Sequence, residues 1–124
     1  MNLVLFLSEE YFDEIREGKN VEYREVKPHY IKMFIINEFK DLCLNSTPEN
    51  VKVAADLAIA LNTPFFKKFD CIDLRRSYSK TSLVKRCEGI TIEKGPNHPF
   101  CKPDKYYFVI SLGDIVSERC DNKI

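Results

Sequence analysis

The 124-residue sequence predicts an α+β fold in a single domain. Two observations support this class: segments in the first half have helical spacing with capping residues, and segments in the second half have strand composition. Apolar residues make up 44% of the chain and charged residues 31%. This is the balance of an ordinary globular protein, and the chain is long enough to bury a core.

The first predicted elements are a strand and a short helix. Met1 to Leu7 is an apolar run typical of a buried strand. Ser8 follows as a helix N-cap, ahead of two glutamates that suit the positive end of a helix dipole. Gly18 can adopt a left-handed conformation and end the helix. The helix carries three apolar residues on one face, Tyr11, Phe12 and Ile15.

A strand and two longer helices are predicted next. Val21 to Glu25 reads as a strand, and Pro28 suits the first turn of a helix that ends near Lys40. Thr47 and Pro48 start another helix, with a capping residue followed by proline. Its apolar residues recur at helical spacing, at Val51, Ala54, Ala55, Ala58 and Leu61. Such an alanine-rich face favours packing rather than a binding site.

The second half consists of predicted strands. They cover Asp70–Leu74, Leu83–Ile92 and Tyr106–Leu112. The last run alternates, as expected of a strand that lies between core and surface. A loop with three prolines precedes it, and the polar tail of residues 117–124 is expected to fray.

Net charge is zero, but charge is unevenly distributed. Residues 1–30 have a net charge of −3, whereas residues 67–88 carry seven basic side chains against three acidic ones. This basic segment includes Arg75, Arg76 and Tyr78, which could contact phosphates and stack on a base. The alternative is a solvated hairpin with its basic side chains on the outer face.

The segment Gly18–Arg24 concentrates charges of both signs. Glu22 and Arg24 point the same way from the predicted strand, and Lys19 lies at the turn before them. A carboxylate between two cations stays ionised, which leaves the cations available to phosphate or carbonyl oxygens. The alternative is a surface ion-pair cluster of little energetic weight.

This Lys-x-x-Glu-x-Arg pattern, after a short helix and a glycine, resembles the Gly-x-Lys-x-x-Glu-x-Arg signature of the ASCH family. In this chain the glycine directly precedes Lys19, and Glu17 stands at the family's glycine position. The resemblance covers the first 30 residues and about 70–115, so that about 40–66 would be a helical insertion. It implies a PUA-like β-barrel with flanking helices. It also implies a cleft lined by Lys19, Glu22 and Arg24 that binds RNA or a nucleotide-like small molecule.

Two other functions remain open. Some ASCH proteins are enzymes, either amidohydrolases acting on N4-acetylcytidine or ribonucleases, and here Lys19 and Glu22 would be the catalytic residues. The amidohydrolases use a threonine where this chain has Glu22, which would instead have to activate water. A protein-interaction module of a phage or mobile element is the third possibility, with its apolar surface in residues 28–66.

Several classes of protein are disfavoured. No apolar run is long enough to span a membrane, and the N-terminal segment does not resemble a signal peptide. Five widely spaced cysteines without a Cys-x-x-Cys pair favour reduced thiols in the cytoplasm. His98 and Cys101 have a metal-like spacing but lack two further ligands. We therefore expect neither a metal nor another cofactor.

Overall fold

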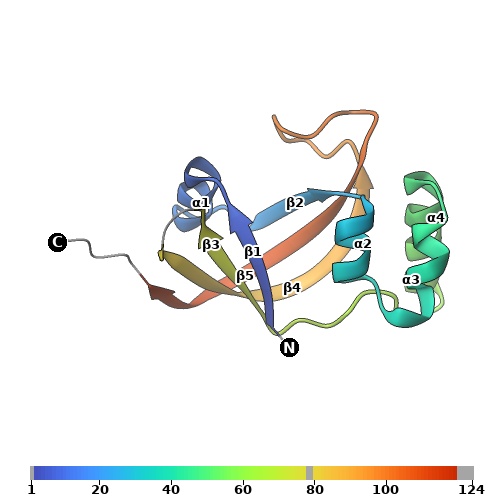
Figure 1. The fold of residues 1–124 in the computed structure, drawn as a ribbon, viewed down its shortest axis with the longest axis horizontal. Helices are drawn as coiled ribbons and strands as arrows, with labels where there is room; N and C mark the ends of the chain where they lie inside the picture. Colours follow the sequence, from blue (N-terminus) through green and yellow to red (C-terminus); the bar gives the residue numbers. More distant parts are fainter. Residues whose placement is uncertain (1, 78–79, 120–124) are drawn as a thin grey trace. The chain divides into compact units, whose positions relative to one another are not determined.

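A computed structural model of the chain describes residues 2–77 and 80–119 (Figure 1). The strands are β1 (Asn2–Leu7), β2 (Val21–Glu25), β3 (Cys71–Arg76), β4 (Ser82–Lys94) and β5 (Tyr106–Arg119). The helices are α1 (Glu9–Arg16), α2 (Pro28–Phe34), α3 (Asn37–Leu44) and α4 (Pro48–Ala60). The strands form one sheet in the order β1-β3-β4-β5-β2. The predicted α+β class is confirmed, and the sheet is compatible with a barrel-like fold. The described residues contain no helix that is long and apolar enough to cross a membrane.

The contacts within the chain define two compact units, which are described separately. Unit 1 comprises residues 1–22, 68–89 and 110–124. Unit 2 comprises residues 23–67 and 90–109. Three of the strands, β2, β4 and β5, contribute residues to both units.

Unit 1 is built on a parallel strand pair. β1 pairs with β3 from Asn2 opposite Cys71 to Leu7 opposite Arg76, and β3 pairs antiparallel with β4. β1 lies at an edge of the sheet, and its residues alternate between buried and exposed. The buried strand predicted over Met1 to Leu7 is present as β1, but only its alternate residues are buried, and Phe6 is 61% exposed. An edge strand with one solvent-facing side needs apolar residues only at alternate positions.

Helix α1 packs against β1 and β3 and buries Phe12 and Ile15. The side chain of Ser8 accepts a hydrogen bond from the Tyr11 N–H, as the predicted N-cap requires. Gly18 has a φ of 120°, which side-chain-bearing residues rarely adopt, and the helix ends just before it. The predicted start and end of this helix are both confirmed.

Unit 2 contains α2, α3 and α4, and α3 contacts both of its neighbours. The single helix predicted from Pro28 to near Lys40 was wrong, because the chain is extended at Ile35 and Ile36. Ile35 forms an isolated antiparallel bridge with Phe66, and the Ile36 N–H donates to the Phe65 carbonyl. Two consecutive β-branched residues favour this extended break.

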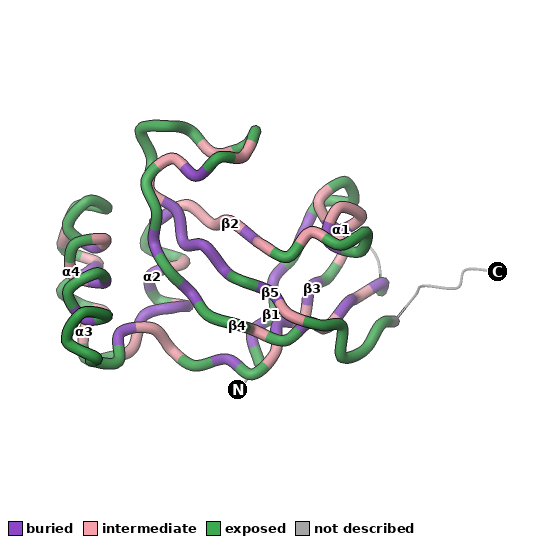
Figure 2. Tube along the Cα trace, turned by 180° about the vertical axis from the view of Figure 1, so that it is seen from behind, coloured by how far each residue is buried: buried purple, intermediate pink, exposed green. Residues whose placement is uncertain are grey.

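Helix α4 begins as predicted, with the Thr47 side chain accepting a hydrogen bond from the Asn50 N–H. Val51, Ala55 and Ala58 are buried, but Leu61, which was expected on the same face, is 66% exposed because it lies at the C-cap. The opposite side of the helix is largely exposed (Figure 2).

Strand β5 extends well beyond Leu112, where its end was predicted. Residues 117–119, which were expected to fray, belong to the strand. The Arg16 guanidinium binds the Glu118 carboxylate, with a distance of 2.6 Å between Nη2 and Oε1. This contact joins α1 to the extended strand within unit 1. The rest of the predicted tail, residues 120–124, lies outside the described residues.

Candidate functional site

Lys19 lies in unit 1, in the turn between α1 and β2. Its Nζ is 3.4 Å from the Glu14 Oε2 and 5.8 Å from the centroid of the Tyr11 ring. A carboxylate and an aromatic face both attract an ammonium group. Helix α1 therefore supplies the groups that position this cation, and only 21% of the Lys19 side chain is exposed.

A second lysine, Lys85 of β4, donates hydrogen bonds to the same turn. Its Nζ donates hydrogen bonds to the carbonyl oxygens of Ile15 (3.2 Å) and Lys19 (3.3 Å) and to the Asn20 Oδ1 (3.4 Å). Lys85 is only 3% exposed. Burial lowers the pKa of its ammonium, and the charge of Asp114 partly opposes this shift.

The role of Lys85 was not predicted, because this lysine lies in the basic segment of residues 67–88, for which a solvated hairpin was one expectation. Lys85 lies two residues after the buried Leu83, so both side chains point to the same face of β4. Its partner on the neighbouring strand β3 is Ile72, which is also buried. A lysine at an apolar position of a strand was the available signal.

Glu22 and Arg24 both belong to β2, and Glu22 is 7% exposed. Arg24 lies in unit 2, where its Nη1 donates to the Tyr30 hydroxyl at 3.0 Å and its Cζ is 5.6 Å from the Tyr30 ring centroid. The Tyr30 ring stacks on Phe34 with an interplanar angle of 10°, and Phe34 contacts Phe108 edge-on. Both phenylalanines are fully buried. The Arg24 guanidinium is therefore held by a stack of rings that reaches the core.

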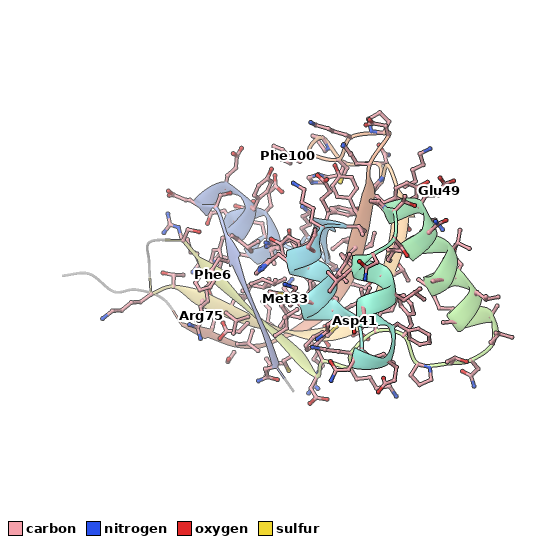
Figure 3. All side chains as sticks on the ribbon, turned by 45° about the vertical axis from the view of Figure 1, so that its right-hand side comes forward. Phe6, Met33, Asp41, Glu49, Arg75 and Phe100 are labelled. Carbon is pink, nitrogen blue, oxygen red and sulfur yellow. The ribbon has the colours of Figure 1, made fainter. Side chains whose placement is uncertain are left out.

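The predicted residues of the basic segment are placed separately. Arg75 and Arg76 are consecutive residues of β3, so their side chains leave opposite faces of the strand. Arg75 Nη2 lies 3.0 Å from the Asp73 Oδ2, and Arg76 forms an ion pair with Glu9. Figure 3 shows Arg75 beside Phe6, its partner in the parallel register. Tyr78 lies outside the described residues.

Unit 2 contains a cavity of about 220 Å³ at the start of α4. Its lining includes the carboxylates of Glu25, Glu49 and Asp104 and the Tyr106 ring. Of the residues predicted to bind a ligand, the five that the structure describes do not line this cavity. It is therefore separate from the Lys-Glu-Arg motif.

An apolar stripe occupies the exposed side of α4. Val53, Leu57 and Leu61 are each more than half exposed and follow one another at four-residue spacing. This stripe lies within residues 28–66, the region in which an interaction module was expected to carry its apolar surface.

Metal-ligating side chains are not clustered in the part of the chain that the structure describes, where no group of three or more His, Cys, Asp or Glu residues could hold an ion. Cys43, Cys71, Cys87 and Cys101 are all in the thiol form. His98 and Cys101 are joined by a backbone hydrogen bond from the Cys101 N–H to the His98 carbonyl. Their spacing therefore belongs to a turn of the loop.

Comparison with known proteins gives no relative: no protein-family model, curated protein or solved structure matches this chain. The resemblance to ASCH domains rests on the motif residues and their flanks, and membership of that family stays a prediction.

Proposed function

We propose that this protein binds RNA or a nucleotide-like ligand through Lys19, Glu22 and Arg24, as an ASCH-like domain of the PUA-like group would. The observation that carries the proposal is that both cations of the motif are held by aromatic and polar neighbours. A cation whose position is already fixed loses less conformational entropy when it binds a phosphate. Cationic groups beside aromatic rings are also typical of surfaces that bind single-stranded nucleic acids.

The burial of Glu22 also supports the proposal. Glutamate side chains are rarely fully buried, because removing a carboxylate from water is costly. A solvated ion-pair cluster would leave this side chain exposed, whereas it is 7% exposed. Buried charged groups are usually paired, and this carboxylate belongs to the same strand as Arg24.

The test is binding of short labelled RNAs and DNAs, single- and double-stranded, at two salt concentrations. We expect RNA binding that weakens with salt and that is reduced in Lys19→Ala and Arg24→Ala, with each salt slope falling by about one. Lys52→Ala is the matched control, since Lys52, like Lys19, forms an ion pair with a carboxylate nearby in sequence, that of Asp56. If all three variants bind RNA equally well, Lys19 and Arg24 are excluded as the binding site.

A hydrolase that uses the same residues is a second candidate, favoured by the same buried carboxylate. Glu22 could take a proton from an attacking water, while Lys19 stabilises the negative charge that develops on the substrate oxygen. In a deacylation, the water oxygen would bond to the acyl carbon as the bond to the departing amine breaks. The proton taken by Glu22 would pass to that amine.

Hydrolysis is tested by incubating the protein with N4-acetylcytidine and with RNA and following the products by chromatography. Turnover by the wild-type protein that is lost in Glu22→Gln would establish an enzyme. If the protein binds RNA but turns over neither substrate, the hydrolase candidate is excluded and the binding function remains.

A further inference from the structure

Two aromatic side chains of the loop between β4 and β5, His98 and Phe100, are in contact, and His98 also contacts Tyr23 of β2, all within unit 2. The ring centroid of His98 is 5.1 Å from that of Tyr23 and 5.3 Å from that of Phe100. Phe100 is 53% exposed and is labelled on this loop in Figure 3. We refer to Tyr23, His98 and Phe100 as the ring platform. It joins the loop to β2, the strand that carries Arg24.

Hydrogen bonds fix the conformation of the loop. The Gly95 N–H donates to the Lys105 carbonyl at 2.8 Å and closes the base of the loop. Farther along, the Lys102 N–H donates to the Tyr107 hydroxyl at 2.8 Å. The Phe100 N–H donates to His98 Nδ1 at 3.2 Å, which fixes the imidazole relative to the Phe100 backbone. The platform is therefore preorganised on an ordered loop.

We propose that the ring platform stacks a base of a single-stranded nucleic acid. The inference rests on the proposed function. It adds that the ring platform recognises a base of the ligand. Phe100 is exposed and contacts the His98 ring, so its ring offers an apolar face to a planar partner, and every nucleobase has such a face. RNA-binding proteins commonly read unpaired bases in this way.

The charge of the loop that carries the platform also suits a nucleic acid. Lys102 and Lys105 are exposed residues of this loop, and Lys94 at the end of β4 lies 5.8 Å from the Tyr106 ring centroid. Residues 94–105 therefore carry three basic side chains against one acidic side chain, Asp104, and this positive balance attracts a phosphate backbone.

The geometry of β2 relates the platform to the motif. Consecutive residues of a strand point to opposite faces, so Tyr23 and Arg24 project from the two sides of β2. β2 is an edge strand of the sheet. A nucleic-acid strand that crosses this edge would meet Arg24 with a phosphate and the ring platform with a base.

The test separates base contacts from phosphate contacts. Binding of a short labelled single-stranded RNA is compared with binding of an abasic sugar–phosphate strand of the same length. We expect Phe100→Ala to weaken binding of the RNA by roughly 5- to 150-fold, the usual range for one stacked base, and to leave binding of the abasic strand unchanged. Leu57→Ala is the control, because Leu57 is 59% exposed in the same unit and lies on α4.

A second variant reports stacking directly. The chain contains no tryptophan, so Phe100→Trp introduces a single indole fluorophore at the platform. We expect this variant to keep the affinity for RNA and its fluorescence to be quenched by RNA but not by the abasic strand. Because Phe100 is half-exposed, neither substitution removes a core side chain.

The outcomes are distinguishable. If wild-type RNA binding depends on Lys19 and Arg24 but Phe100→Ala matches Leu57→Ala, the ring platform is excluded and the proposed function stands. Loss of abasic-strand binding in Phe100→Ala would also exclude stacking. If the wild-type protein binds neither strand, both the proposed function and the platform are overturned.

Discussion

The side-chain nitrogen of Lys85 lies 3.3 Å from the backbone carbonyl oxygen of Lys19. A buried lysine of β4 thus holds the backbone of the residue whose own ammonium is the first cation of the motif. The Leu112 N–H donates to the Asn20 carbonyl at 2.8 Å, so β5 holds the next residue of the turn. Two strands therefore determine where the motif begins.

Replacing Lys85 with methionine should destabilise the protein. The variant keeps most of the side-chain volume but leaves the Lys19 carbonyl and the Asn20 Oδ1 without this donor, whereas the Ile15 carbonyl keeps its hydrogen bond from the Gly18 N–H. We expect the free energy of unfolding in urea to fall by about 1–3 kcal/mol, the usual cost of an unsatisfied buried polar group. RNA affinity should fall as well, because the Lys19 turn loses its support.

Arg86→Met is the matched control, since Arg86 is exposed and is the next residue of the same strand. It should change the unfolding free energy by less than about 0.5 kcal/mol. An equal loss in both variants would mean that the three hydrogen bonds of Lys85 do not stabilise the turn.

The Lys85 ammonium should also give a pH signature. Burial lowers its pKa in the folded protein, whereas in the unfolded chain the pKa returns to about 10.4. Between these two values the unfolded chain binds more protons, so the stability of the wild type rises with pH relative to Lys85→Met. Urea unfolding of both proteins through an alkaline pH series measures this difference. If the difference in unfolding free energy between the two proteins stays constant up to the ordinary lysine pKa, the pKa of Lys85 is not lowered by folding.

Gly95→Ala should distort the loop that carries the ring platform. Gly95 has a φ of 54°, and a Cβ there would lie 2.7 Å from the Pro103 carbonyl oxygen. We expect a loss of more than about 1 kcal/mol of stability, from the left-handed backbone and the clash together. Asn62→Ala is the control, because Asn62 has a nearly equal φ of 53°. Similar losses in thermal unfolding at both positions would show that the loop relieves the clash freely.

Cys43 and Cys87 should react slowly with alkylating reagents. Burial raises the pKa of both thiols, and the charges of Glu88 and Cys71 raise that of Cys87 further, against a backbone hydrogen bond from Gly89. Less thiolate is then present at a mildly alkaline pH, and the thiolate is the reactive form. Peptide mass spectrometry after iodoacetamide treatment should show strong protection at both sites, which is lost in urea. Rapid labelling of Cys43 in the folded protein would contradict this prediction.

The sequence predicted elements best where local signals decide the structure. Ser8, Gly18 and Thr47 mark helix ends because capping and positive φ depend on neighbouring residues. The break between α2 and α3 was missed because it depends on Phe65 and Phe66, which are distant in sequence from Ile35. Tertiary pairing overrides helical spacing at such positions.

In the candidate site, too, contacts between residues distant in sequence could not be predicted. The motif residues could be selected from their spacing, but their partners could not all be foreseen. Glu14 and Tyr11 are close to Lys19 in sequence, whereas Lys85 is reached only through the strand pairing of the sheet. The ring platform was also missed, because the contact between His98 and Tyr23 crosses a large sequence distance.

The parallel pairing of β1 with β3 has a consequence for synthesis of the protein. Asn2 is opposite Cys71, so a chain emerging from a ribosome presents β1 long before its partner strand has been made. Until then the alternating apolar side of β1 has no β3 to cover it, and closing so long a loop is entropically slow. Nascent chains that stall between α1 and β3 would therefore expose an unpaired strand, which makes this interval the one in which chaperone binding or aggregation is most favoured.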